Sequence, residues 1–350
     1  MRRERMRALV FKKPKEFAVE ERPIPEVKEG EVLVQVKYAG VCGTDVRIYN
    51  GTKKIGAPRI TGHEFAGEVI EIGKGVTSVK VGDRVTVYPM IACNECYACL
   101  SGRTNICVNR ITLGYELDGG FAEFVKIPKE AVERGNIIKL PQNVSYEEGA
   151  VSEPMTAAYH GIERSGLKSG NTVAIIGTGP IGLCHVQLAK LKGPKKIIIV
   201  EPDEQKRKLA LEFGATDTIN PLDGDVHNKV MDLTQGEGVD VVILDVGLPK
   251  VIEGSLSYVK KGGMFLLFAG CPVGSSITID PNLIHYKEIM FTGSSSSSPE
   301  NQSKVLELLS TGKINLKKLI TGTFHLEDWE QAFNMKANYQ GLKSVFKIEK

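Results

Sequence analysis

Residues 172–182 read Thr172-Val-Ala-Ile-Ile-Gly177-Thr-Gly179-Pro-Ile-Gly182, an apolar run that ends in a Gly-x-Gly-x-x-Gly motif. Such a run predicts a strand buried on both faces, and the residues after it have the length of a helix. In this setting Gly177 makes the tight turn, Gly179 lets the backbone approach a pyrophosphate, and Gly182 lets the helix pack on the strand. The motif therefore predicts a dinucleotide site, with a purely structural glycine turn as the alternative.

The residues that follow the glycines complete the predicted nucleotide site. Pro180 and Ile181 open the helix, whose free N–H groups and partial positive charge suit phosphates. The next apolar run ends at Glu201, whose carboxylate can accept hydrogen bonds from the adenosine ribose and would repel a 2′-phosphate. We therefore expect NAD to be preferred over NADP. Lys206 is a further candidate contact to the cofactor, and together with Arg207 it weakens that preference.

The pattern of apolar residues divides the chain into two predicted domains. From about residue 150 onward, apolar runs alternate with helix-length stretches, which predicts a doubly wound parallel sheet over residues 154–296. These further runs are Lys196–Val200, Val239–Val246 and Met264–Phe268. Before residue 150, apolar and polar residues alternate at period two, which predicts antiparallel strands. These segments are Glu31–Tyr38, Phe65–Ile72 and Asp83–Tyr88. Because Lys343–Ile348 alternates in the same way, we assign residues 1–153 and 297–350 to one mostly β domain.

Length and composition exclude several classes of protein. The 350 residues suit two domains, and 42% hydrophobic with 25% charged residues is ordinary for a globular protein. The net charge of only +3 gives no electrostatic reason to expect nucleic acid or a membrane surface as partner. No apolar run approaches the roughly 18 residues of a membrane-spanning helix, and no secretion signal is visible. We expect a soluble, cytoplasmic protein.

Four of the seven cysteines follow the spacing Cys93-x2-Cys96-x2-Cys99-x7-Cys107, within a loop at residues 90–110. Four thiolates on a short polar loop suit a tetrahedral zinc ion, and they leave no open position for chemistry. Metal binding would then supply folding energy that the loop cannot obtain from burial. The spacing predicts a structural zinc site. Disulfides, free thiols and an iron–sulfur cluster are the alternatives.

Three short motifs precede the nucleotide signature: Cys42-Gly-Thr-Asp, Gly62-His-Glu and Glu153-Pro. Each is weak alone, because a single cysteine or histidine is commonly structural. Together with the four-cysteine loop and the glycine motif, in this order, they make residues 6–350 resemble the zinc-dependent medium-chain dehydrogenases. Within that family the chain is most similar to the polyol (sorbitol-type) and threonine dehydrogenases.

The resemblance implies a GroES-like, mostly β catalytic domain beside a Rossmann nucleotide-binding domain. It also implies that Cys42, His63 and Glu64 are ligands of a catalytic zinc ion. Glu153 would complete the coordination sphere, directly or through a water molecule. Asp45 is expected to orient His63. Each chain would then hold two zinc ions, one catalytic and one structural.

The resemblance further implies oxidation of an alcohol, with zinc polarising the substrate hydroxyl and the nicotinamide accepting hydride. Thr44 would relay the proton that the substrate hydroxyl loses. Glu64 and Glu153 would be the carboxylates that take part in catalysis at the zinc ion. Many family members have a histidine five residues after the metal cysteine, where this chain has Arg47. Arginine stays protonated and cannot shuttle a proton. We favour release of the proton to water. The alternative is that Arg47 binds a phosphate or an anionic substrate.

By resemblance, two more segments line the nicotinamide half of the cofactor: Phe268, Ala269 and Gly270, and Gly293, Ser294 and Ser295. Our first expectation for the substrate is a polyol or sugar alcohol. L-Threonine and a 2,3-butanediol-type secondary alcohol are the alternatives. A zinc-stabilised NAD-binding protein without turnover and a metal-free quinone reductase are the rivals from other classes. The family branch also implies a homotetramer or a homodimer.

Overall fold

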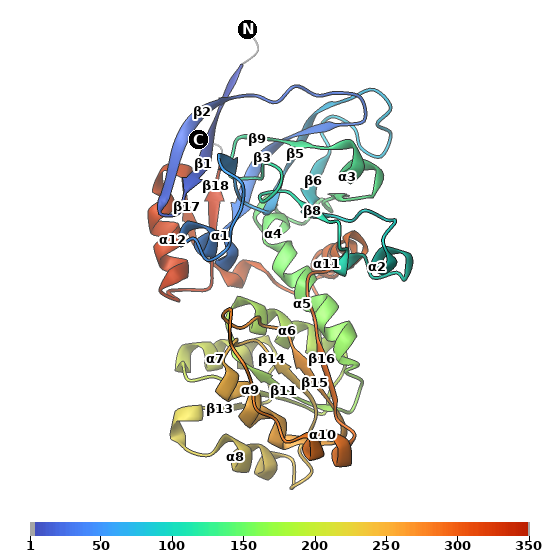
Figure 1. Cartoon of the computed structure of the whole chain (residues 1–350), viewed down its shortest axis with the longest axis vertical. Helices are drawn as coiled ribbons and strands as arrows, with labels where there is room; N and C mark the ends of the chain where they lie inside the picture. Colours follow the sequence, from blue (N-terminus) through green and yellow to red (C-terminus); the bar gives the residue numbers. More distant parts are fainter. Residues whose placement is uncertain (1–3, 349–350) are drawn as a thin grey trace. The chain divides into compact units, whose positions relative to one another are not determined.

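The computed structural model describes residues 4–348 and separates into two compact units. The first unit holds the residues up to Thr156 together with those from Ser297 onward, and the second holds Ala157–Ser296 (Figure 1). Within the described residues, every helix is too short or too polar to span a membrane.

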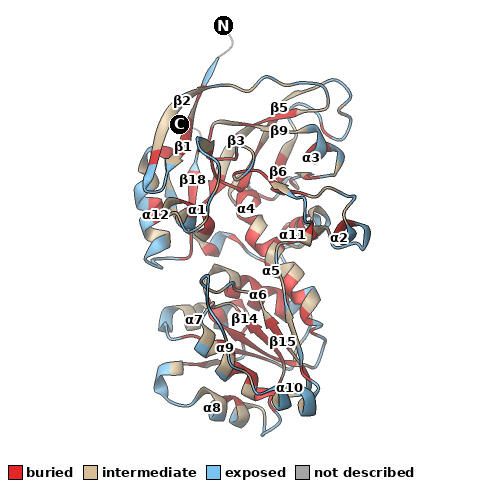
Figure 2. Cartoon of the chain, in the orientation of Figure 1, coloured by how far each residue is buried: buried red, intermediate tan, exposed pale blue. Residues whose placement is uncertain are grey.

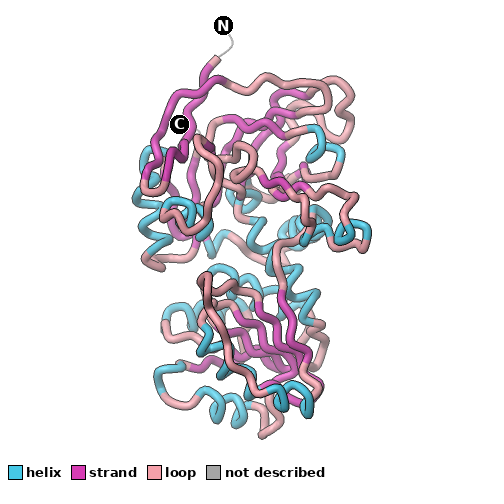
Figure 3. Tube along the Cα trace, in the orientation of Figure 1, coloured by secondary structure: helices cyan, strands magenta, loops and turns pink. Residues whose placement is uncertain are grey.

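The first unit is built mainly of antiparallel strands, which Figure 3 shows as short magenta segments joined by loops. Its largest sheet has the order β10-β6-β5-β3-β18-β17, and β9 also pairs with β3. A smaller sheet has the order β2-β1-β4, and β7 pairs with β8. The strands are β1 (Arg5–Lys13), β2 (Glu16–Pro23), β3 (Val32–Gly40), β4 (Arg59–Ile60), β5 (Glu64–Ile72), β6 (Arg84–Val87), β7 (Met90–Ile91), β8 (Ile111–Thr112), β9 (Phe124–Ile127), β10 (Ile137–Lys139), β17 (Ile320–Phe324) and β18 (Lys343–Lys347).

Alternation explains why these strands form a core. Val32, Val34 and Val36 of β3 are fully buried, whereas the residues between them on the strand include polar side chains such as Gln35. The last strand, β18, pairs antiparallel with β3, so the C-terminal residues join the N-terminal sheet. Short helices cover this unit: α1 (Gly43–Tyr49), α2 (Tyr97–Leu100), α3 (Lys129–Glu133), α4 (Tyr146–Ala150), α11 (Pro299–Ser310) and α12 (Trp329–Ala337).

The second unit contains a parallel sheet of order β13-β12-β11-β14-β15-β16. The strands are β11 (Thr172–Ile176), β12 (Lys196–Val200), β13 (Asp217–Ile219), β14 (Val239–Leu244), β15 (Val259–Leu267) and β16 (Met290–Gly293). The helices are α6 (Pro180–Leu191), α7 (Glu204–Phe213), α8 (Val226–Leu233), α9 (Pro249–Ser255) and α10 (Pro281–Lys287). The helix α5 (Ser152–Ser165) begins in the first unit and ends in the second. β11 is buried along its whole length and β14 at every residue except the partly buried Asp240, which explains why both sequences are mainly apolar (Figure 2).

The strand order reverses between β11 and β14, which is the position where doubly wound sheets bind ligands at their carboxyl ends. The doubly wound sheet predicted from the apolar runs is therefore confirmed. Several strand boundaries differ from the prediction, including those of β15 and β14. β15 begins five residues before the predicted Met264, at Val259, because its first half includes the polar and glycine residues 260–263. β14 ends at Leu244, so Asp245 and Val246 lie in the loop that follows it.

Candidate functional site

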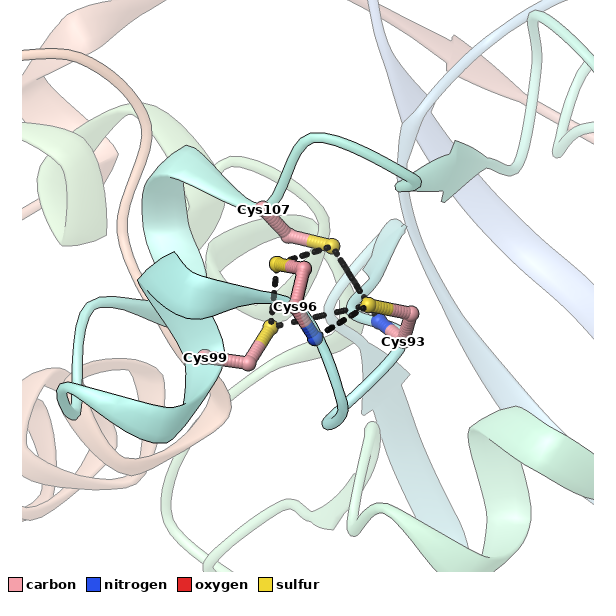
Figure 4. A group of neighbouring side chains, drawn as sticks. All are labelled: Cys93, Cys96, Cys99 and Cys107. Carbon is pink, nitrogen blue, oxygen red and sulfur yellow. Dashed lines mark hydrogen bonds between the residues drawn. The ribbon is translucent and has the colours of Figure 1, made fainter.

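The four-cysteine loop brings its thiols together (Figure 4). The Sγ atoms lie 3.4 Å apart for Cys93 and Cys107, 3.5 Å for Cys96 and Cys99, and 3.9 Å for two further pairs. A tetrahedral zinc ion with bonds of about 2.3 Å requires sulfur atoms about 3.8 Å apart. A disulfide requires about 2.05 Å, and all four cysteines are free thiols. The disulfide alternative is therefore wrong, and the donor set fits a single zinc ion.

Local backbone structure, and not a buried core, arranges this loop. Cys96 lies at the N-terminus of α2, and its N–H donates to the Sγ of Cys93 at 3.4 Å. The backbone N–H of Cys99 lowers the pKa of Cys96 to about 6, whereas burial raises the pKa of Cys99 to about 12. Tyr97 and Leu100 are 74% and 76% exposed, so α2 buries only Ala98 and Cys99. Metal binding would add to the folding energy of such a loop.

A second group of potential metal ligands consists of Cys42, His63 and Glu64. One ligand atom of each lies within 4.8 Å of the others. Cys42 immediately precedes α1, and its N–H donates to the carboxylate of Asp45 at 2.8 Å, which fixes this turn. Glu64 is the first residue of β5, and His63 precedes it. A thiolate, an imidazole and a carboxylate are the donor types that zinc takes at a site with an exchangeable position.

Asp45 and Tyr115 orient the imidazole of His63. The Nδ1 atom of His63 lies 4.0 Å from Oδ1 of Asp45 and 3.4 Å from the hydroxyl of Tyr115. With Nδ1 facing these two side chains, Nε2 would be the nitrogen that ligates a metal ion. Asp45 is fully buried, and burial raises its pKa to about 7 although the charge of His63 opposes the shift. A divalent ion at the site would favour the charged form of this carboxylate.

The sequence interpretation missed two residues that position Glu64. The Nζ of Lys343 donates to Oε1 of Glu64 at 2.6 Å, and both side chains are buried. Burial alone would lower the pKa of Lys343, but attraction from Glu64 and then Cys42 outweighs it and raises that pKa. Gly40 pairs with Glu64 across the sheet, and a Cβ there would lie 2.3 Å from the carboxylate. A larger residue at position 40 would therefore force the Glu64 carboxylate to move from its present position.

Glu153 lies outside the group of mutually close ligand atoms found among residues 4–348. It is nevertheless close enough to interact electrostatically with His63, Glu64 and Cys42. Burial raises its pKa to about 7, and attraction to His63 only partly counteracts the shift. Of the two arrangements expected for Glu153, this placement fits coordination through a water molecule better than a direct bond.

Thr44 lies next to Cys42, with its Oγ1 at 3.7 Å from the thiol sulfur. Arg47, one turn further along α1, donates a hydrogen bond to that same Oγ1 at 3.1 Å. The guanidinium thus occupies an acceptor position on Thr44, and the hydroxyl keeps its own hydrogen for another partner. Tyr115 also interacts with the Thr44 side chain.

In the second unit, the three glycines have the geometry that the motif requires. Gly177 has φ = +92°, which favours glycine. A Cβ on Gly182 would lie 2.0 Å from the carbonyl oxygen of Gly177, so no side chain fits between the helix and the turn. A Cβ on Gly179 would meet nothing within 4 Å, which leaves open space beside the backbone. Pro180 and Ile181 form the first turn of α6 directly after it.

Glu201 lies at the carboxyl end of β12 and is held by the glycine loop. Its Oε2 accepts hydrogen bonds from the N–H of Thr178 at 2.8 Å and from the Thr178 hydroxyl at 3.0 Å. Arg207 donates to the backbone carbonyls of Glu201 at 2.7 Å and Pro202 at 2.6 Å. The backbone N–H of Lys206 donates to Asp203 at 3.0 Å, and its side chain is half-buried.

The other predicted cofactor residues follow the carboxyl ends of neighbouring strands. Phe268, Ala269 and Gly270 come after β15, and Gly293 ends β16 immediately before Ser294 and Ser295. Parallel strands place all of these residues at the same edge of the sheet as the glycine motif. Sequence patterns did not reveal the buried pair beneath this edge, in which His185 Nδ1 lies 2.8 Å from Asp245 Oδ2.

Comparison with known proteins agrees with this geometry. Residues 28–142 match the model of the alcohol dehydrogenase GroES-like domain, and residues 180–311 match that of zinc-binding dehydrogenases. The L-threonine 3-dehydrogenase of Pyrococcus furiosus is 37% identical, with 99% of this chain and 99% of its own length aligned. The sorbitol dehydrogenase of Halalkalibacterium halodurans is 34% identical, over 93% of this chain and 94% of its own. A zinc-binding dehydrogenase structure from Sinorhizobium meliloti, bound to NADP, is 33% identical with a TM-score of 0.93, over 99% and 100% of the two chains. The expected GroES-like and Rossmann fold class is thereby confirmed.

Proposed function

The chain belongs to the zinc-type medium-chain alcohol dehydrogenase family, and from this premise we propose that it oxidises a secondary alcohol to a ketone with NAD. The observation that carries the proposal is the convergence of Cys42, His63 and Glu64, whose ligand atoms lie within 4.8 Å of one another. The substrates that we propose to test are polyols, L-threonine and 2,3-butanediol. L-Threonine is the second candidate beside polyols because a 37% identical relative is named for it.

In this proposal a zinc ion held by Cys42, His63 and Glu64 supplies Lewis acidity, which makes an alcohol hydroxyl more acidic. The cofactor supplies the hydride acceptor. Thr44 receives the hydroxyl proton at Oγ1 and passes on its own, and water carries that proton away because Arg47 cannot accept it. Lys343 holds the Glu64 carboxylate in place at the proposed metal site through their buried ion pair.

We further propose that each chain holds a second zinc ion at Cys93, Cys96, Cys99 and Cys107. The sulfur spacing of 3.4–3.9 Å supports this assignment. We also propose NAD as the preferred cofactor. The support is Glu201, whose buried carboxylate at the end of β12 would repel a 2′-phosphate and accept hydrogen bonds from ribose hydroxyls.

The test combines turnover with zinc content. Zinc-loaded enzyme is assayed for NADH and NADPH formation with polyols, inositols, L-threonine and 2,3-butanediol. Cys42→Ser and Glu64→Ala should abolish turnover while NAD still binds, and Cys42→Ser should lower the zinc content from two ions per chain to one. Cys271→Ser is the matched control, because Cys271 lies outside both groups of metal ligands. Full activity in Cys42→Ser or Glu64→Ala would refute the assignment of the metal site.

A further inference from the structure

Two cationic side chains, Arg47 and Lys53, lie beside the Cys42–His63–Glu64 group. The Nη2 of Arg47 is 3.1 Å from Oγ1 of Thr44, which in turn is 3.7 Å from Sγ of Cys42. The Nζ of Lys53 lies 3.9 Å from the centroid of the Tyr115 ring, whose own centroid is 5.2 Å from that of His63. Each cation is thus separated from a metal-ligating residue by a single intervening side chain.

The backbone holds the two cations together. The N–H groups of Thr52 and Lys53 both donate to the carbonyl oxygen of Arg47, at 2.9 and 3.1 Å. Gly51 makes the turn between them possible with φ = +76°. The pair is therefore arranged before any ligand binds, which reduces the entropy cost of binding.

Neither cation is neutralised by the protein. Among residues 4–348, neither Arg47 nor Lys53 forms an ion pair with an acidic side chain. Burial, and then repulsion from Arg47, lowers the pKa of Lys53, and the attraction of Glu116 does not restore it. A half-buried lysine whose contact is an aromatic ring, next to a second cation, leaves an excess of positive charge at this position.

We infer that Arg47 and Lys53 bind an anionic group, a carboxylate or a phosphate, that the alcohol substrate carries. This inference rests on the proposed function and deepens it. The guanidinium of Arg47 has five N–H donors, and its side chain makes one hydrogen bond to the described residues, at Thr44. The remaining donors match two oxygens of a carboxylate or phosphate, and Lys53 adds a compact charge. Because the contacts to Cys42 are short, a substrate with few carbons between hydroxyl and anion suits the site.

Paired substrates, one with and one without an anionic group, test the inference. L-Threonine is compared with L-threonine amide, and sorbitol 6-phosphate with sorbitol, in steady-state assays of the zinc-loaded enzyme with NAD. One anionic member should have a kcat/KM at least about tenfold above its neutral partner, through a lower KM. The first pair detects a carboxylate and the second a phosphate. Equal kcat/KM within both pairs would overturn the inference while leaving the proposed function intact.

Variants locate the effect. Lys53→Gln and Arg47→Gln should each lower the anionic-to-neutral ratio of kcat/KM by about tenfold. Lys54→Gln is the matched control, because it removes the same charge from an exposed neighbouring position and should keep the ratio of the unmodified enzyme. A loss of ratio of the same size in Lys54→Gln would overturn the inference, since the effect would then reflect net charge alone.

Calorimetric measurement of acetate and inorganic phosphate binding tests the anion site separately from the proposed dehydrogenase function, because it needs no turnover. Binding of one of these anions should weaken about tenfold in Lys53→Gln and remain in Lys54→Gln. If this result is obtained while no alcohol in the panel is oxidised, the anion site stands and the proposed function fails. If neither anion binds and neutral alcohols are oxidised as well as charged ones, the anion site fails and the proposed function stands.

Discussion

Replacement of Lys343 by methionine tests whether its ion pair with Glu64 stabilises the unit that holds the Cys42–His63–Glu64 group. The Lys343 and Glu64 side chains are 5% and 0% exposed, and Nζ lies 2.6 Å from Oε1. At that distance and an effective dielectric constant of about 20, the attraction is on the order of 6 kcal/mol, which offsets several kcal/mol of desolvation for each ion. Methionine retains the apolar stem but leaves the carboxylate buried and unpaired. We therefore expect the zinc-free protein to lose about 3–5 kcal/mol of unfolding free energy.

Urea unfolding followed by tryptophan fluorescence measures this loss, because the only tryptophan, Trp329, packs against the rings of Phe17 and Tyr49 in the same unit. With a slope of about 2–3 kcal/mol per molar urea, the midpoint should fall by about 1–2 M. Lys347→Met is the matched control, because Lys347 is an exposed lysine of the same strand and its loss should change stability by no more than about 0.5 kcal/mol. The double variant Lys343→Met/Glu64→Gln should recover much of the loss, since no charge is left unpaired.

Equal midpoints for zinc-free Lys343→Met and Lys347→Met would refute the reasoning that Lys343 neutralises Glu64. Excess zinc provides a second comparison, because a divalent ion bound by Glu64 becomes the counter-charge of the carboxylate. Zinc should therefore narrow the difference in stability between the unmodified protein and Lys343→Met. A difference that zinc leaves unchanged argues against Glu64 as a metal ligand.

Three further changes have defined outcomes. Cys107→Ser should lower the zinc content by one ion per chain and lower the thermal midpoint, whereas undiminished zinc would contradict the four-cysteine site. Glu201→Gln should lower the NAD-to-NADP ratio of kcat/KM about tenfold, because the repulsion of a 2′-phosphate is lost; Glu204→Gln, exposed three residues further on, is the control. In the zinc-free folded protein, burial raises the pKa of Glu153 from 4.5 to about 7, so the folded state binds this proton more tightly than the unfolded state. The stability that this proton provides is therefore present at low pH and is lost as the pH rises from 4.5 to about 7. Glu153→Gln should remove about 3 kcal/mol of this fall in unfolding free energy, which urea midpoints measured at several pH values would show. An unchanged dependence of the midpoint on pH would count against the raised pKa of Glu153.

The sequence predicted those features that depend on residues close together in the chain. Continuous apolar runs located β11 and β12 at their observed bounds, because strands buried on both faces need apolar side chains at every position. The spacing of the four cysteines predicted their convergence, since short links between ligands permit little else. The first half of β15 was missed for the converse reason: Lys260, Lys261 and Gly262 are exposed or half-exposed, and Gly263 has no side chain, so the segment lacks the apolar signal.

The residues that adjust the metal site could not be predicted, because they depend on long-range pairing. Lys343 and Glu64 are 279 positions apart in the sequence, and they meet because β18 and β5 both pair with β3. One signal was nevertheless present. Lys343 begins an alternating strand on the same face as Val345, which is fully buried, so the pattern placed a charge at a buried position. A lysine in such a place requires an acidic partner, although the pattern cannot say which.

The two lysines near Cys42, Lys343 and Lys53, differ in whether an acidic side chain balances their charge. This difference distinguishes a lysine that stabilises the protein from one that is available to bind a substrate. Lys343 is buried and its charge is matched within the protein by Glu64, so its removal should affect stability first. Lys53 is half-buried next to Arg47, and neither has an acidic partner among the described residues. A protein gains no stability from cations held together in this way, because they repel each other and lose water. The positive charge that the first unit leaves unbalanced near Cys42 is therefore the feature by which we infer that the site selects its substrate, and the charge of the substrate is the property to vary first.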